Sequence, residues 1–134
     1  MTNATDADNK PHRPIEHQLV LQSGNAWNGQ PYSGYPEGKP CISVMRMSLP
    51  PHSELPWHTH PMPNSAYVLS GELIIEDKES GETASVRAGE ALNETLNRAH
   101  RGYTAEQATE LVVFYAGVEG QALSLSLPGE ASEF

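Results

Sequence analysis

The chain has 134 residues, 37% of them hydrophobic, which is enough for one domain with its own core. Eight basic against 17 acidic residues give a net charge of −9, which argues against nucleic acid or an anionic membrane as a partner. The single cysteine, Cys41, excludes a disulfide within the chain, and no apolar run approaches the roughly 18 residues of a spanning helix. With no signal-peptide core at its polar N-terminus, we expect a cytoplasmic protein.

Residues 1–14 are mostly polar and offer almost nothing to bury. We expect them to form a disordered tail, with His12 as a bystander, ahead of a single domain over residues 15–134. Residues 15–22 include three consecutive apolar side chains at Leu19–Leu21 and are a candidate first strand, at a sheet edge or exchanged with a partner chain.

Residues 24–40 have no hydrophobic periodicity and are rich in glycine and proline, which predicts an irregular loop. A loop of this length in a compact domain usually serves function or an interface. Its aromatic residues Trp27, Tyr32 and Tyr35 could close over a pocket; the alternative, which we favour, is that they cover the outer wall of the fold.

Residues 41–49 alternate in a way that leaves both faces largely apolar, as in a strand inside a sandwich. Pro50 and Pro51 end this strand, because proline cannot donate to a sheet ladder. Arg46 lies on it either as a rim residue or as an anion-binding group inside a pocket. We expect His52, next to the prolines, at the surface.

Residues 55–63 read Leu-Pro-Trp-His-Thr-His-Pro-Met-Pro, and the prolines make a helix improbable. In an extended chain, side chains at i and i+2 leave the same face, so His58 and His60 should point into one space. Imidazole is the commonest metal-ligand side chain. The alternative is a pair of exposed histidines in a proline-rich loop without a function.

Further strands are predicted over residues 66–69 and 72–76, joined as a hairpin by a tight turn at Ser70-Gly71, and over residues 83–87. Glycine suits the turn because it adopts the backbone angles that such a turn needs.

In residues 91–96, Leu92, Glu94 and Leu96 share one face of an extended chain. If the leucines face the interior, Glu94 goes with them, and a buried carboxylate needs a metal or an arginine as partner. The opposite register would leave Glu94 in solvent.

The last strands are predicted over residues 100–104, 109–117 and 121–127. The second of these has the strongest β signal, and both its faces are apolar. A single barrel covers one face, so a second subunit is expected over the other, giving a homodimer. About nine or ten short strands without helical periodicity predict an all-β protein, an antiparallel double-sheet jelly-roll barrel.

The stretch from His58 to Gly71, His-Thr-His-Pro-Met-Pro-Asn-Ser-Ala-Tyr-Val-Leu-Ser-Gly, resembles the first motif of the cupin superfamily: His-x-His, three or four residues, Glu, six residues, Gly. Residues 89–104 resemble the second cupin motif in a degenerate form. There Gly89 and His100 match, while Thr95, Asn97 and Thr104 replace a proline, a glycine and an asparagine. The resemblance covers roughly residues 40–118 and is closest to small, single-domain bacterial cupins.

The resemblance implies a metal site in the barrel mouth with His58, His60 and His100 as ligands. The first-motif glutamate is replaced by Asn64, whose neutral amide is a poorer ligand. Either the site has three histidines only, or Glu94 completes it, as a fourth ligand or as a catalytic base one shell out. The donors suit one divalent transition metal, namely iron, manganese, nickel, copper or zinc.

The expected function is that of a metal-dependent oxidoreductase, dioxygenase-like, acting on a small enolisable or phenolic molecule. The alternatives are a non-catalytic metal- or ligand-binding cupin, such as a sensor or storage protein, and a metal-dependent isomerase or lyase. A dry wall for the site is expected from five apolar side chains: Met62, Leu92, Leu96, Val112 and Phe114.

Overall fold

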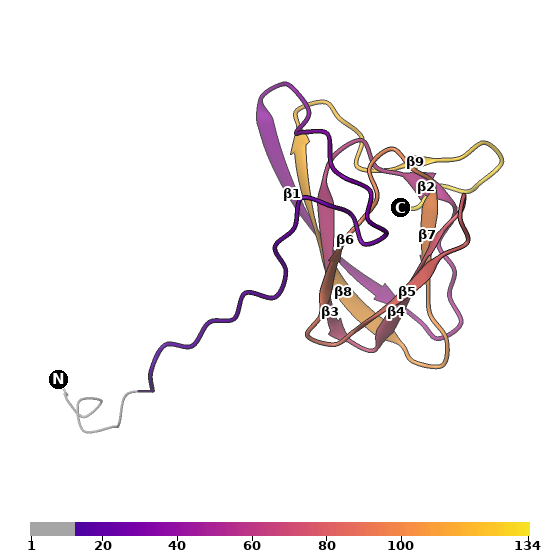
Figure 1. Cartoon of the computed structure of the whole chain (residues 1–134). Helices are drawn as coiled ribbons and strands as arrows, with labels where there is room; N and C mark the ends of the chain where they lie inside the picture. The colour runs from indigo at the N-terminus through magenta and orange to yellow at the C-terminus, as the bar shows by residue number, and fades with distance from the viewer. Residues whose placement is uncertain (1–12) are drawn as a thin grey trace.

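The computed structural model describes residues 13–134, so His12 and most of the predicted tail lie outside the described residues. These residues contain nine strands and no helix (Figure 1). No helix in the described part of the chain is therefore available to cross a membrane. The strands are β1 (Pro40–Leu49), β2 (His58–Thr59), β3 (Asn64–Ser70), β4 (Glu72–Asp77), β5 (Thr83–Arg87), β6 (Ala91–Asn93), β7 (His100–Tyr103), β8 (Thr109–Val118) and β9 (Leu125–Ser126).

The strands form two sheets, and every pairing between them is antiparallel. One sheet has the order β1-β8-β3-β6 and the other β5-β4-β7-β2-β9. The sheets face each other across the core (Figure 1). This arrangement confirms the predicted all-β, antiparallel double-sheet fold.

The core lies between the sheets, and β8 supplies its inner wall with every second residue. Leu111, Val113 and Tyr115 are buried there. The expectation that Val112 and Phe114 would line the site is wrong, because they stand on the other face of β8, where Phe114 is exposed. Both faces of this strand are apolar, so the sequence pattern could not choose between them.

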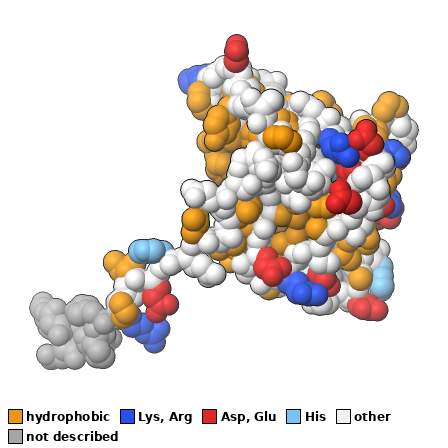
Figure 2. All heavy atoms as spheres, in the orientation of Figure 1, with side chains coloured by type: hydrophobic (Ala, Val, Ile, Leu, Met, Phe, Trp, Pro, Cys, Tyr) orange, Lys and Arg blue, Asp and Glu red, His pale blue; other side chains and the backbone are white. Residues whose placement is uncertain are grey.

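Strand β1 is an edge strand of the four-stranded sheet, paired only with β8. Its outer face is open: Ile42 is 55% exposed and Val44 67%. Figure 2 shows hydrophobic side chains along the side of the molecule that β1 forms in Figure 1. In a single chain, the outer apolar face of this strand therefore remains uncovered. Arg46 pairs with Glu110 at the exposed rim, at 2.6 Å, and does not reach a pocket.

The chain turns tightly at Gly71 as predicted, but the two strands that the turn joins do not pair with each other. Strand β3 belongs to the four-stranded sheet and β4 to the five-stranded one, so Gly71 passes the chain from one sheet to the other. Its φ of 85° favours glycine, and a Cβ there would collide with the carbonyl oxygen of Ala108. The tight fit explains the glycine; the predicted pairing of the two strands was wrong.

Residues 13–22 form no strand in this chain, unlike the predicted candidate strand, and their first part leads away from the barrel (Figure 1). Gln18 and Val20 border a cleft against β5 and β6. The loop of residues 24–40 that follows packs along the edge of β6 that does not pair with β3. The backbone amide of Trp27 donates to the carbonyl of Asn93 at 2.9 Å, and the phenol of Tyr32 donates to the carbonyl of Glu94.

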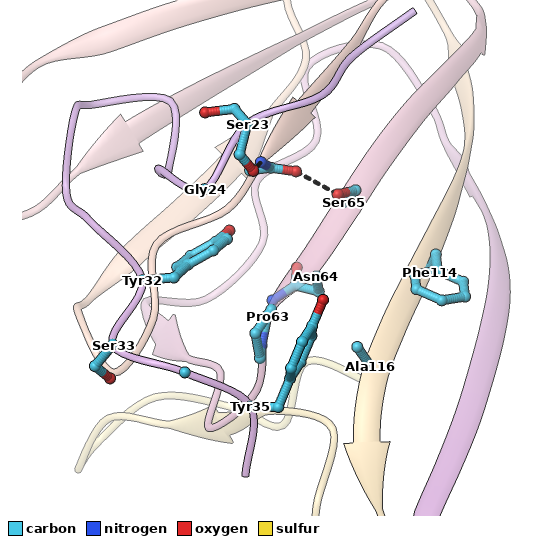
Figure 3. A pocket seen from close by; sticks show the side chains of 12 residues that line it. Ser23, Gly24, Tyr32, Ser33, Tyr35, Pro63, Asn64, Ser65, Phe114 and Ala116 are labelled. Atoms are coloured by element: carbon cyan, nitrogen blue, oxygen red, sulfur yellow. Dashed lines mark hydrogen bonds between the residues drawn. The ribbon is translucent and has the colours of Figure 1, made fainter. Parts of the chain in front are cut away.

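Tyr32 and Tyr35 line a cleft of about 380 Å³ on the outer side of the four-stranded sheet, beside Phe114 (Figure 3). None of the histidines borders this cleft. Tyr32 and Tyr35 thus lie on the outer wall, the alternative that the sequence analysis favoured, although they also border a cleft there. Trp27 instead packs against the core. His52 is exposed at the surface, as predicted.

Candidate metal centre

Three histidines meet at one end of the core. Strand β2 is only two residues long, and its extended backbone directs His58 and His60 to the same side, where both are 1% exposed. Strand β7 lies beside β2 with His100 directly opposite His58. The face parity predicted from the His-x-His spacing is therefore confirmed.

Glu94 reaches the same space from the other sheet. It follows β6, which pairs with β3, and its backbone amide donates to the carbonyl of Asn64 at 3.0 Å. Glu94 is buried together with Leu92 and Leu96, so the interior register is confirmed. The chain thus places a carboxylate next to the position where the first motif lacks its glutamate.

The four side chains form a tight cluster, with one ligand atom of each lying within 4.8 Å of the others. His58 Nε2 and His60 Nε2 are 3.1 Å apart. Glu94 Oε1 lies 2.8 Å from His100 Nε2 and 3.2 Å from His60 Nε2. All four side chains are buried, so the donors converge on one small volume that solvent does not reach.

The outward ring nitrogen of each histidine faces a backbone carbonyl oxygen. His58 Nδ1 lies 2.7 Å from the carbonyl of Pro56, His60 Nδ1 2.7 Å from that of Leu123, and His100 Nδ1 2.9 Å from that of Arg98. A carbonyl only accepts, so each Nδ1 carries the proton and donates it. In the neutral rings the lone pairs therefore sit on the Nε2 atoms, which point at one another.

The members of the cluster differ in the direction in which their surroundings shift the pKa. Burial, together with repulsion from His100 and His60, lowers the pKa of His58 to about 4, so this ring is neutral at physiological pH. Burial opposes ionisation of Glu94, but the charges and hydrogen bonds of His60 and His100 outweigh it and hold its pKa well below the usual range. Burial likewise opposes a charge on His60, yet Glu94 raises the pKa of that imidazole. Without a metal, the proton that balances Glu94 resides on a neighbouring ring.

Asn64 is buried beside the cluster, but its amide nitrogen is used locally and donates to the carbonyl of Met62 at 3.1 Å. Its side-chain oxygen is buried and has no hydrogen-bond partner among the described residues. Glu94, and not Asn64, contributes the oxygen that lies among the histidine nitrogens.

The sequence analysis missed one acidic residue near the cluster. Glu133 Oε2 lies 3.4 Å from His58 Nε2, and the Glu133 side chain is 5% exposed. Burial raises the pKa of this carboxyl. Glu133 stands in a short polar stretch at the end of the chain, where no periodicity or motif distinguishes it from a solvated acid.

A family model described as a cupin domain matches residues 45–116, more than half of the chain. The chain belongs to the cupin family. No curated protein gives a match.

Solved structures share the fold. A conserved protein of unknown function from Streptococcus pyogenes has 23% identity and a TM-score of 0.53, with 59% of this cupin and 67% of that chain covered. The polyketide cyclase RemF from Streptomyces resistomycificus has 20% identity and a TM-score of 0.56, over 67% and 62%. The DMSP lyase DddQ from Ruegeria pomeroyi has 19% identity and a TM-score of 0.58, over 75% and 48%. The chain thus spans about half to two thirds of these proteins, and at such identity the likeness concerns the fold alone.

The departures from the second cupin motif have local explanations. Thr95, in place of the proline, accepts a hydrogen bond from His100 Nδ1 at 2.8 Å and donates to the carbonyl of Arg98 at 3.1 Å. Asn97, in place of the glycine, has a φ of 53°, a conformation that asparagine tolerates better than most residues. In this cupin, His100 Nδ1 therefore has two acceptors, the hydroxyl of Thr95 and the carbonyl of Arg98, that orient its ring.

Proposed function

We propose that this cupin binds one divalent transition metal ion through His58, His60, His100 and Glu94, and that it acts there on a small organic molecule. The observation that carries the proposal is the pair of Nε2 atoms 3.1 Å apart, each with its Nδ1 proton already donated to a carbonyl. Two lone pairs at this distance repel, so the arrangement favours a cation between them, either a metal ion or the proton that a metal would displace.

The donor set fits such an ion. Three neutral imidazoles and one carboxylate are ligands that iron, manganese, nickel, copper and zinc accept. Each imidazole is oriented by a hydrogen bond from its outer nitrogen, the usual support for a metal-bound histidine. A bound ion would take the place of the proton that otherwise balances Glu94.

Glu94 suits the role of ligand better than that of base. Its carboxyl is ionised, with a pKa held well below the usual range, whereas a general base acts best with a pKa near the working pH. Its Oε1 lies within hydrogen-bonding distance of two of the ligand nitrogens.

When bound, the metal would supply a Lewis acid or a redox centre. We propose a dioxygenase-like oxidoreductase as the reaction type. The cavity beside His58 and Glu94 holds about 20 Å³, room for one molecule the size of water or dioxygen. Its walls include Leu73, Ile75 and Val113, which keep bulk water away from reactive species.

A second candidate is a metal-dependent lyase or isomerase. The support is the shared fold of the proteins named as a polyketide cyclase and a DMSP lyase. Because folds host many chemistries, this support is an analogy. A third candidate, a sensor or storage protein without turnover, shares the metal site.

Oxygen uptake separates these candidates. The protein is loaded anaerobically with iron(II), then mixed with air-saturated buffer and a panel of small diketones and flavonols, with the His58→Ala/His60→Ala variant as the matched control. Uptake in stoichiometric proportion to product, absent in the variant, is the expected result. Product without oxygen uptake identifies a lyase or isomerase, and metal binding without product from a broad panel favours a sensor.

We also propose a homodimer, supported by the open outer face of β1 and β8. Ile42, Val44 and Phe114 are 55%, 67% and 43% exposed on that face, and a surface of this kind usually marks an interface. Light scattering at micromolar concentration should give twice the 14.6 kDa of one chain, and Val44→Glu should return it to a monomer. A wild-type mass of one chain contradicts the proposal.

A further inference from the structure

The end of the chain is tied to the strand that carries the histidines. Strand β9 pairs with β2, with Ser126 opposite His58. Beyond β9, the amide of Leu127 donates to the carbonyl of Trp57 at 3.0 Å, and the amide of Trp57 donates to the carboxylate of Glu130 at 2.9 Å. We call residues 127–134 the C-terminal strap. In Figure 1 the chain ends close to β2, β7 and β9, at the mouth of the barrel.

The strap delivers the carboxylate of Glu133 to the candidate metal centre. Its Oε2 lies 3.4 Å from His58 Nε2, and the side chain is 95% buried. Its other oxygen, Oε1, is buried without a hydrogen bond of good geometry among the described residues, although the hydroxyl of Ser124 lies near this carboxyl. A buried carboxylate oxygen without a full set of donors is costly. Glu133 thus directs one oxygen at His58, and its other oxygen has no oppositely charged partner among the described residues.

The charges of the five side chains balance a divalent ion. Glu94 and Glu133 bring two negative charges when ionised, and the three imidazoles are neutral when they serve as ligands. Four ligands without Glu133 would leave half of a 2+ charge unbalanced in a buried site, which costs free energy. With Glu133 the buried cluster is neutral overall.

Glu133 also separates two spaces. It lines the 20 Å³ cavity beside His58 and Glu94, and it lines a cleft of about 360 Å³ between the strap and β9. No other residue borders both. A molecule that enters from the cleft therefore meets Glu133 before it meets the histidines.

From this arrangement, and resting on the metal site proposed above, we propose that Glu133 on the strap is a fifth, displaceable metal ligand. It caps the ion at rest, and a small carboxylate-bearing molecule replaces it through the cleft. A displacing molecule must bring an anionic oxygen of its own, because a neutral one would leave the buried ion with an unbalanced charge. The substrate class that fits the site is thus a small organic acid.

Cobalt(II) and acetate test this proposal without any catalytic assay. The absorption spectrum of bound cobalt(II) reports its coordination number and ligands. Wild type, Glu133→Gln, Glu133→Ala and the control Glu130→Gln are titrated with cobalt(II), then with acetate. The control removes one charge from the same strap but keeps an acceptor for the Trp57 amide.

Wild type and Glu130→Gln should bind one cobalt per chain with equal affinity and the same spectrum. Glu133→Gln should bind cobalt roughly tenfold more weakly, with a changed spectrum. Acetate should restore the wild-type spectrum in Glu133→Ala, and should do so at a concentration about tenfold below the one that perturbs the wild type.

The experiment distinguishes a failure of the strap proposal from a failure of the metal-site proposal. If wild type binds cobalt and both Glu133 variants keep its affinity, spectrum and acetate response, the strap proposal is wrong and the four-ligand site stands. If wild type binds no cobalt, the metal site is wrong, and the strap proposal falls with it. If a Glu133 variant does not fold, as judged by circular dichroism, the other variant decides.

Discussion

Asp77 and Glu94 are both buried, and their carboxylates are neutralised in different ways. Asp77 is fully buried and accepts hydrogen bonds from Arg98 Nε and Nη2, both at 2.7 Å, and from the amide and hydroxyl of Ser80. Glu94 lies instead among three imidazoles whose own protons are donated elsewhere.

The two carboxylates also differ in how completely their surroundings supply hydrogen-bond partners. Arg98 holds the pKa of Asp77 well below its usual range, although burial opposes this, and both oxygens of Asp77 are satisfied. At the histidine cluster, Glu94 has only titratable imidazoles as partners, and one oxygen of Glu133 has no hydrogen-bond partner among the described residues. A buried acid with a complete set of protein donors stabilises the fold. One with incomplete partners indicates a ligand site.

The largest expected effect is the loss of the metal. Replacing His58 and His60 by alanine removes two of the four donors, so the variant should hold no stoichiometric metal while its circular dichroism stays that of a β protein. Elemental analysis measures this, with the exposed His52→Ala as control. A double variant that retains its metal would show that the histidines are not its ligands.

Glu94→Gln should have the next largest effect. It removes the one anionic donor among the four and should weaken metal binding by roughly 10- to 100-fold, as measured by competition with a chelator. Glu90→Gln, four residues away and exposed, should bind like the wild type. Unchanged metal affinity with lower turnover would reassign Glu94 from ligand to base. Unchanged affinity and unchanged turnover would leave a site of three histidines only.

Asp77→Asn should do the reverse of Glu94→Gln. It weakens hydrogen bonds to a charged arginine in a buried place and should lower the free energy of unfolding by about 2 kcal/mol, with metal affinity unchanged. Urea denaturation measures the loss. Glu79→Gln removes an exposed partner of the same Arg98 and should change stability little. Metal loss in Asp77→Asn would erase the distinction between the two sites.

The smallest expected effect is the pH dependence of the stability difference between wild type and Asp77→Asn, which isolates the contribution of Asp77. Because its folded-state pKa is depressed, its contribution is complete above the ordinary aspartate pKa of about 3.9 and is lost as pH falls below it. The stability difference between wild type and Asp77→Asn should therefore be constant from about pH 5 to 8 and shrink toward pH 3. A difference that grows on acidification has the wrong sign.

The convergence of the candidate ligands His58, His60 and Glu94 could be predicted from the sequence because face parity is local, whereas His100 was assigned only by resemblance to the second cupin motif. The spacing of His58 and His60 sets their face by the period of a strand, and the same parity placed Glu94 with two leucines. Prediction failed where the decision was not local. Both faces of β8 are apolar, so only the completed sheet decides that Val113 points inward and Phe114 outward.

Glu133 could not be predicted for a related reason. Its position depends on β9 pairing with β2 and on two hydrogen bonds to the backbone of Trp57, contacts that join distant parts of the chain. The hairpin expected at Gly71 failed similarly, because a tight turn looks the same whether it joins neighbouring strands or two sheets.

The most direct test of the central claim is elemental analysis of the wild-type protein purified without chelators. The ligand atoms of His58, His60, His100 and Glu94 converge within 4.8 Å of one another, so the account predicts one divalent transition metal per chain, or uptake of one equivalent when the purified protein is incubated with such ions. A protein that carries no metal and takes up none of the five candidate ions at micromolar concentration would contradict it.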